Sequence, residues 1–241
     1  MWEYALLGTL QGIFEWIPVS SEGVVALVSQ GMIKSLNSVD LAIFLHLGTL
    51  LALFVYFLKD WKDLLLLKDK EFVKFFIIVT IISGAIGFGM YKMAKEFSVG
   101  WALLMLTGLG LLLTSFFQSK QIKWKISNNL SAIIVGVLQG LSAIPGVSRS
   151  GSTIFGLSLS ESNPKEILRK SYLISAPVVM GSSLYLYLDN PSIVNQSWVG
   201  LIFSFIFGLI FLKMLLTFAD KINFSKFTLI FGLLCILGSL F

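Results

Sequence analysis

The residues best suited to chemistry lie in two short polar interruptions of otherwise apolar sequence. The first places Gln11 and Glu15 four residues apart and then continues into residues 20–23 (SSEG). The second places Arg149 in the middle of residues 148–153 (SRSGST). An ionisable group inside a membrane-spanning segment costs about 2.5–3.5 kcal/mol on insertion scales, so each one is a functional candidate.

Arg149 and its neighbours predict an anion-binding site. A guanidinium always carries its charge and offers paired donors that match phosphate. The surrounding residues supply hydroxyls and free N–H groups where a helix is expected to begin, and such a terminus attracts anions. Besides Arg149, the predicted phosphate-binding residues are Ser148, Ser150, Gly151 and Thr153. Alternatively, Arg149 pairs with Glu15 only to lock the two interruptions together.

Glu15 follows Gln11 by four residues, so the two side chains share one face of a predicted helix. Beside a phosphate, this carboxylate could hold a divalent cation or act as a general base. Alternatively, it is a neutral buried acid that bonds to Gln139 or a hydroxyl. Gln11 could orient a ligand or a water molecule, but its amide cannot serve as a base.

Four other polar residues are weaker candidates. Ser20 and Ser21 could be nucleophiles, although isolated serines at such positions are more often helix caps. Glu22 is as well suited to capping a loop as to binding a ligand. His46, the only histidine, lies in an apolar segment, where we expect a packed and hydrogen-bonded side chain without a catalytic role.

The composition indicates that the protein which positions these groups is a membrane protein. Of the 241 residues, 56% are hydrophobic and 13% are charged, about half the charged share of soluble domains. These values exclude a disordered chain, a coiled coil and an ordinary soluble enzyme. The long apolar runs favour helices over a β-barrel. We interpret the net charge of +5 as a topology signal and expect no nucleic-acid partner.

Six apolar segments are long enough to cross a bilayer, whose core of about 30 Å requires roughly 20 helical residues. They are residues 40–58, 72–91, 99–118, 170–188, 198–218 and 225–241. The two interrupted segments, 4–32 and 130–160, have halves that reach only about 21 Å each at 1.5 Å per residue. We therefore predict two re-entrant helix–loop–helix hairpins.

The two hairpins resemble each other in sequence. Residues 8–12 (GTLQG) match residues 136–140 (GVLQG), and an Ile-Pro pair follows in both cases. We interpret this as a duplication within a single membrane domain 1–241. Repeat one covers residues 1–128 and repeat two covers 129–241, each with one hairpin and three spans. The odd number of spans inverts the second repeat, so that the hairpin tips can meet near the membrane midplane.

The lysines and arginines in the loops predict the orientation. The side from which the second hairpin enters carries fourteen of them, and the opposite side carries three. Because basic loops remain in the cytoplasm, both termini and the base of the first hairpin are predicted to lie outside a cell membrane.

The two motifs resemble those of a known family. Residues 10–23 (LQGIFEWIPVSSEG) are similar to the E/Q-xxx-E and PVSS signature of the undecaprenyl-diphosphate phosphatases, the BacA/UppP family. Residues 145–153 (PGVSRSGST) are similar to its PGxSRSxxT signature. The resemblance implies an all-α integral membrane protein with six transmembrane helices and two re-entrant hairpins in an inverted-topology repeat.

The resemblance also implies an activity. A polyprenyl diphosphate would be hydrolysed to the monophosphate and phosphate in a pocket open to the outer face, aided by Mg²⁺ or Ca²⁺. This recycles a lipid carrier for cell-envelope glycans. The implied catalytic residues are Glu15, Arg149 and Ser21, and the implied metal ligands are Glu15 and Glu22. The implied substrate-binding residues are Gln11, Ser20, Glu22, Ser148, Ser150, Gly151 and Thr153. Membrane lipid is an expected partner, and a homodimer is left open.

One position departs from the family pattern. Studied members read SSTGH where this chain has residues 20–24 (SSEGV), so Val24 replaces a histidine proposed for catalysis. Two outcomes stay open. In one, hydrolysis proceeds with Glu15 or Glu22 supplying the base and metal functions. In the other, the chain is a polyprenyl-phosphate transporter that moves its lipid without hydrolysis, since inverted repeats suit alternating access.

Overall fold

The computed structural model describes residues 1–33, 37–94, 101–120, 126–143, 147–191, 193–219, 221 and 223–240. Within these ranges the regular structure consists of eleven helices and no strand, so the predicted all-α class is confirmed. Residues 144–146, which include the Ile-Pro pair of the second interruption, lie outside the described ranges.

The first interrupted segment forms two short helices, α1 (Trp2–Phe14) and α2 (Ser21–Met32). Between them, Pro18 lacks a backbone N–H and cannot continue a regular helix. The side chain of Ser20 accepts a hydrogen bond from the backbone N–H of Gly23 and so caps α2. The predicted pair of helices with a break between them is therefore present.

The second interrupted segment has the same construction, with α7 (Asn128–Leu141) and α8 (Arg149–Ser158). Ser127 caps α7 by accepting from the N–H of Leu130, and Ser148 caps α8 by accepting from the N–H of Gly151. The depth of either segment in a membrane, and the inverted repeat, stay predictions.

Within the part of the chain that the structure describes, four helices are long and apolar enough to cross a membrane. They are α3 (Ser38–Tyr56), α5 (Lys70–Ala94), α9 (Pro164–Asp189) and α10 (Ile193–Phe218). The remaining predicted spans coincide with α6 (Trp101–Ser119) and α11 (Phe224–Gly238), which pack against each other. At 15 residues, α11 is shorter than a usual span.

The predicted span 40–58 does not continue to its expected end, because α3 stops at Tyr56 and a separate short helix, α4 (Leu58–Leu65), follows. No residue of α4 is buried. Arg169 of α9 ties α4 to the rest of the molecule, since its Nε donates to Oδ1 of Asp60 at 2.7 Å. Hydropathy did not predict this helix, because four of its five central residues, 59–63 (KDWKD), are charged.

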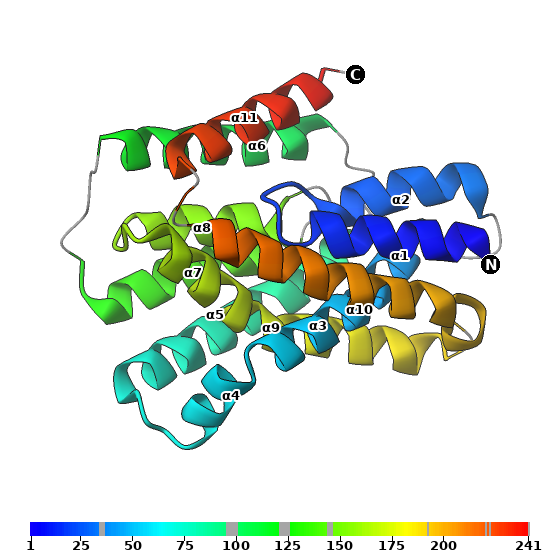
Figure 1. Cartoon of the computed structure of the whole chain (residues 1–241), viewed down its shortest axis with the longest axis horizontal. Helices are drawn as coiled ribbons and strands as arrows, with labels where there is room; N and C mark the ends of the chain where they lie inside the picture. Colours follow the sequence, from blue (N-terminus) through cyan, green and yellow to red (C-terminus); the bar gives the residue numbers. More distant parts are fainter. Residues whose placement is uncertain are drawn as a thin grey trace.

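Close helix contacts hold the first interrupted segment in place. In Figure 1, α1 lies alongside α10, and α10 in turn packs on α3. A Cβ added to Gly8 would overlap the carbonyl oxygen of Gly200, and one added to Gly12 would lie 2.6 Å from the backbone nitrogen of Gly208. Small residues at such contacts let membrane helices approach closely.

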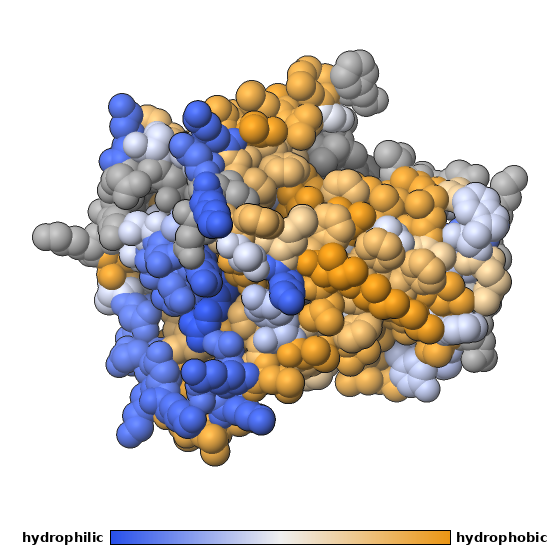
Figure 2. All heavy atoms as spheres, viewed as in Figure 1, coloured by the Kyte–Doolittle hydropathy of each residue, from blue (hydrophilic) through white to orange (hydrophobic). Residues whose placement is uncertain are grey.

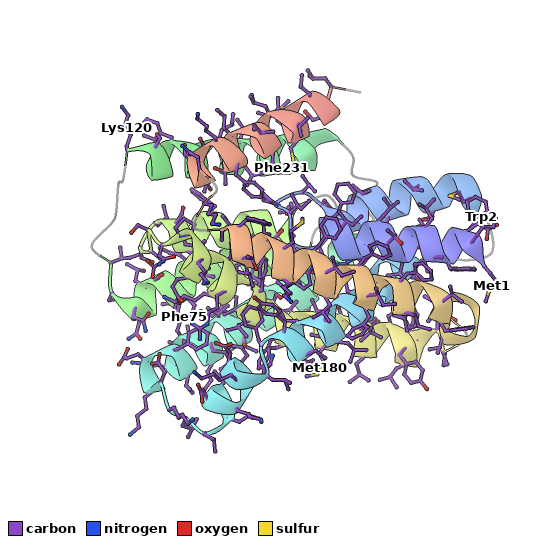
Figure 3. The ribbon with its side chains drawn as sticks, in the orientation of Figure 1. Met1, Trp2, Phe75, Lys120, Met180 and Phe231 are labelled. Atoms are coloured by element: carbon purple, nitrogen blue, oxygen red, sulfur yellow. The ribbon has the colours of Figure 1, made fainter. Side chains whose placement is uncertain are left out.

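The charged residues gather at one end of the molecule. Figure 2 shows the hydrophilic surface at the left end, where the exposed lysines of α4 and of the start of α5 lie. Most of the remaining surface in this view is apolar. Figure 3 places Lys120 at this charged end, whereas Met1 and Trp2 lie at the opposite end. This segregation is the pattern expected of a chain with one basic membrane face.

Candidate active site

Two serine hydroxyls of the second interruption bond to the first. Oγ of Ser148 donates to the carbonyl oxygen of Val19 at 3.1 Å, and Oγ of Ser150 donates to that of Ile17 at 2.9 Å. These bonds satisfy carbonyl groups that the break in the first segment leaves without helical partners. As a result, the residue between the two serines, Arg149, lies against the end of α1.

The carboxylate of Glu15 is the centre of the site. It forms an ion pair with Arg149 through Oε1. Its other oxygen, Oε2, accepts from Nε2 of Gln11 at 2.8 Å and from Oγ of Ser21 at 2.9 Å. Nε2 of His46 lies 3.1 Å from the same oxygen. Since only 3% of the Glu15 side chain is exposed, these partners stabilise a charge that water cannot reach.

Two polar atoms at this site are buried without a hydrogen-bond partner among the described residues. They are Nη1 of Arg149 and Oε1 of Gln11. Leaving a buried donor or acceptor unpaired costs about 1–3 kcal/mol, and more for a charged group, so such atoms are rare in folded proteins. The unpaired guanidinium nitrogen is compatible with the anion-binding role predicted for Arg149, which stays a prediction.

The other predicted phosphate-binding residues support Arg149. Oγ1 of Thr153 lies 2.5 Å from Oγ of Ser171, which ties α8 to α9. The space around Gly151 is tight, since an added Cβ would lie 3.2 Å from the Cβ of Ser148. Arg149 is the first residue of α8, where unpaired N–H groups and the helix dipole favour an anion. The loop thus holds its arginine at a positive helix terminus.

The three polar residues after Pro18, namely Ser20, Ser21 and Glu22, make different contacts. Ser20 is the helix cap already described, and its neighbour Ser21 instead bonds to Glu15. The carboxyl group of Glu22 lies within electrostatic reach of Glu15, His46 and Arg149. No hydrogen bond to this carboxyl group is found among the described residues, which distinguishes it from the fully bonded Glu15.

The residue that the sequence did not assign to the site is His46. It is packed and hydrogen-bonded as expected, since its Nδ1 lies 2.8 Å from the carbonyl oxygen of Ala42. Its other nitrogen, however, reaches the central carboxylate. No spacing rule connects residue 46 with residue 15, because they lie on different helices. The available signal was that the only histidine of an integral membrane protein lies inside an apolar segment.

A small cavity lies beside the ion pair. Glu15 and Arg149 line it together with side chains from α3 and α9, among them Thr49, Leu53 and Ser175. Its volume of about 10 Å³ is enough for a single water molecule. A diphosphate therefore requires side chains or helices to move apart before it can reach Arg149.

Aromatic residues fix the chain directly after Glu15. The hydroxyl of Tyr172 in α9 donates to the carbonyl oxygen of Trp16 at 2.7 Å, and the two rings pack edge to face at 5.1 Å. The indole Nε1 of Trp16 donates to the carbonyl oxygen of Gly208 in α10 at 2.8 Å. Two long helices thus hold the break that carries the central carboxylate.

Comparison with known proteins agrees with this arrangement. The family model described as "Bacitracin resistance protein BacA" matches residues 4–238. A protein of Methanococcoides burtonii named undecaprenyl-diphosphatase is 34% identical, over 98% of this chain and 97% of its own length. Its namesake from Haloarcula marismortui is 33% identical over 98% of this chain and 96% of its own. The protein of the same name from Aquifex aeolicus is 33% identical over 94% of this chain and 92% of its own length. The family resemblance is confirmed, and the chain belongs to the bacitracin resistance protein BacA family.

Proposed function

We propose that this protein hydrolyses undecaprenyl diphosphate to the monophosphate and phosphate, and so recycles a lipid carrier for cell-envelope glycan synthesis. The family and the names of its relatives support this reaction. The observation that carries it is the guanidinium of Arg149, whose buried Nη1 has no partner among the described residues, beside a serine that bonds to a carboxylate. An anion-binding arginine next to a hydroxyl and its base is the arrangement that phosphoryl transfer requires.

In the proposed mechanism, Oγ of Ser21 attacks the terminal phosphorus of the diphosphate while its proton passes to Oε2 of Glu15. The bond between that phosphorus and the bridging oxygen breaks. The lipid monophosphate departs with the bonding electrons and takes the proton from Glu15. Water then attacks the phosphoserine with Glu15 as its base, which releases phosphate and restores Ser21. Arg149 stabilises the charge on the transferring phosphoryl group.

Substrate binding separates the ion pair between Glu15 and Arg149. While Arg149 holds Oε1, the carboxylate is a weak base because a neighbouring cation stabilises its charge. A phosphate competes for the guanidinium, which matches its geometry and has one donor nitrogen, Nη1, without an acceptor among the described residues. The substrate thereby releases the base that its own hydrolysis requires.

A divalent cation such as Mg²⁺ or Ca²⁺ fits this site only together with the substrate. Both oxygens of Glu15 already have partners, whereas the carboxyl group of Glu22 has none among the described residues. The described residues contain no group of three or more His, Cys, Asp or Glu side chains suited to a metal. Glu22 would supply one oxygen ligand and the diphosphate the others. The cation would neutralise phosphate charge.

The membrane arrangement is part of the proposal. The charged end in Figure 2 faces the cytoplasm, which puts the N-terminus and the opening of the site on the outer side. The segments α1–α2 and α7–α8 are re-entrant hairpins of an inverted repeat whose breaks meet at depth, where Glu15 meets Arg149. The transporter alternative is not favoured, because the matching relatives are named for hydrolysis.

The test measures phosphate released from undecaprenyl diphosphate by purified protein in detergent, with Mg²⁺, with Ca²⁺ and with a chelator. Arg149→Ala and Glu15→Ala should abolish release. Ser182→Ala serves as a matched control, because among the described residues that hydroxyl bonds to the carbonyl of Val179 within its own helix, α9. Background release by the unmodified protein with every metal would refute hydrolysis, and Arg149-dependent lipid binding without release would favour transport.

A further inference from the structure

His46 contacts the proposed base from outside both motifs. It lies in the middle of α3, and 12% of its side chain is exposed. Its nearest charged or titratable neighbours come from three other elements: Glu15 at the end of α1, Glu22 in α2 and Arg149 in α8. The position of the family's motif histidine is occupied by Val24, and His46 is the only histidine in the chain.

The imidazole of His46 connects a rigid helix to a break in the chain. Nδ1 lies 2.8 Å from the carbonyl oxygen of Ala42, one turn earlier in α3, and Nε2 lies 3.1 Å from Oε2 of Glu15. Both contacted atoms are acceptors, so the ring presents an N–H group to each. The backbone carbonyl fixes the plane of the ring, and the ring then determines where Oε2 can lie.

We infer that His46 is a positioning residue for the proposed hydrolysis, which holds the carboxylate of Glu15 in line with Ser21 from α3. This inference rests on the proposed function. Glu15 lies directly after the last residue of α1, so the helix alone does not determine where its side chain points. Once a phosphate takes Arg149 away from Oε1, the bonds to Oε2 are those that remain.

The anchoring of α3 supports this role. A Cβ on Gly48, two residues after His46, would lie 2.6 Å from the carbonyl oxygen of Leu201 in α10. The hydroxyl of Ser204 in α10 donates to the carbonyl oxygen of Leu45 at 2.8 Å. His46 is therefore attached to a part of α3 that cannot shift without moving α10, which makes it a fixed point for Glu15.

The decisive experiment replaces His46 with glutamine or with asparagine, because each amide side chain reproduces the position of one ring nitrogen of the imidazole. The amide nitrogen of His46→Gln reaches the place of Nε2 and can donate to Glu15, whereas that of His46→Asn reaches only the place of Nδ1. His46→Leu removes both donors. Steady-state phosphate release gives kcat and KM for each variant, and thermal unfolding in detergent reports whether each is folded.

We expect His46→Leu and His46→Asn to lower kcat by about 10- to 100-fold, because a misplaced catalytic group loses rate rather than substrate affinity. KM should change by less than about threefold, as expected when an interaction acts mainly in the transition state. His46→Gln should stay within about fivefold of the unmodified kcat. A Gln variant as slow as Leu would overturn the inference, since it would mean that the ring itself is required. Full activity of Leu or of Asn would overturn it as well.

A spectroscopic measurement keeps the inference testable apart from hydrolysis. Because the chain has one histidine, ¹⁵N-histidine labelling gives NMR signals from His46 alone. Glu15→Gln should shift both ring-nitrogen signals, whereas Glu3→Gln, whose carboxylate bonds to the N-terminal amine at the start of α1, should leave them unchanged. If Glu15→Gln leaves them unchanged, the contact is absent and the inference fails, even where phosphate release is normal. If the signals shift but no phosphate is released, the proposed function fails instead.

Discussion

The substitution Arg149→Lys tests whether the site needs a guanidinium or only a positive charge. In the structure, one terminal nitrogen of Arg149 pairs with Glu15, and the other is buried with no partner among the described residues. A lysine brings one ammonium group to the same region. It cannot present two donors in a fixed plane to a phosphate.

The expected cost follows from the number of donors lost. A hydrogen bond to a charged group contributes about 1.5–3 kcal/mol. Losing one such bond to the transferring phosphoryl group should lower kcat/KM by about 10- to 150-fold, because each 1.36 kcal/mol is a factor of ten. Arg149→Ala also removes the charge and should reduce release to background. Gln11, Ser21 and His46 still bond to Glu15, so we expect both variants to fold, with Arg149→Ala the less stable of the two.

The assay is phosphate release at substrate concentrations well below KM, where the initial rate reports kcat/KM directly. Thermal unfolding of the same preparations in detergent separates lost activity from lost structure. Unchanged kcat/KM in Arg149→Lys would refute the argument that the unpaired nitrogen awaits a phosphate oxygen. A loss of kcat/KM as complete as that of Arg149→Ala would also contradict the expected magnitude, because the positive charge of the lysine would then contribute nothing to the rate.

Three further substitutions test other parts of the structure. Ser21→Ala should lower kcat by at least about 1,000-fold and abolish any phosphoserine seen by mass spectrometry. An unchanged kcat would mean that water attacks the phosphorus directly. Gly8→Ala should lower the free energy of unfolding by about 1–3 kcal/mol in detergent melts, because the added methyl overlaps the backbone of Gly200. Tyr172→Phe should cost about 1–3 kcal/mol in the same melts by leaving the carbonyl of Trp16 unpaired. An unchanged melting temperature would contradict either stability prediction.

The arrangement of Glu15 explains how a buried charged pair can be retained at a functional site. Breaking a buried ion pair by deleting one partner is strongly destabilising, because it leaves a charge without compensation. Here a phosphate can replace the carboxylate as the partner of Arg149, and Gln11, Ser21 and His46 still bond to Glu15. The site can therefore exchange partners without leaving either charge unpaired.

Much of this protein follows from its sequence alone. Hydrocarbon requires every backbone group to be satisfied within its own segment, so the apolar runs had to be helices. Pro18 and the cap at Ser20 determine where the first segment breaks and resumes. The cost of burying charge is by itself enough to identify Glu15 and Arg149 as functional candidates. These features are local, because they depend on neighbours along the chain.

The tertiary structure determined what local rules could not. The pairing of Glu15 with Arg149 spans 134 residues, and it depends on serine hydroxyls that find carbonyl groups in another segment. Helix α4 was not expected, because its residues 59–63 (KDWKD) are mostly charged and are assigned to a loop by hydropathy alone. His46 reached the site because α3 packs against both α2 and α9, and no sequence spacing records the packing of one helix on another. Residue type and spacing identify groups capable of chemistry, but packing between distant segments determines which of them meet.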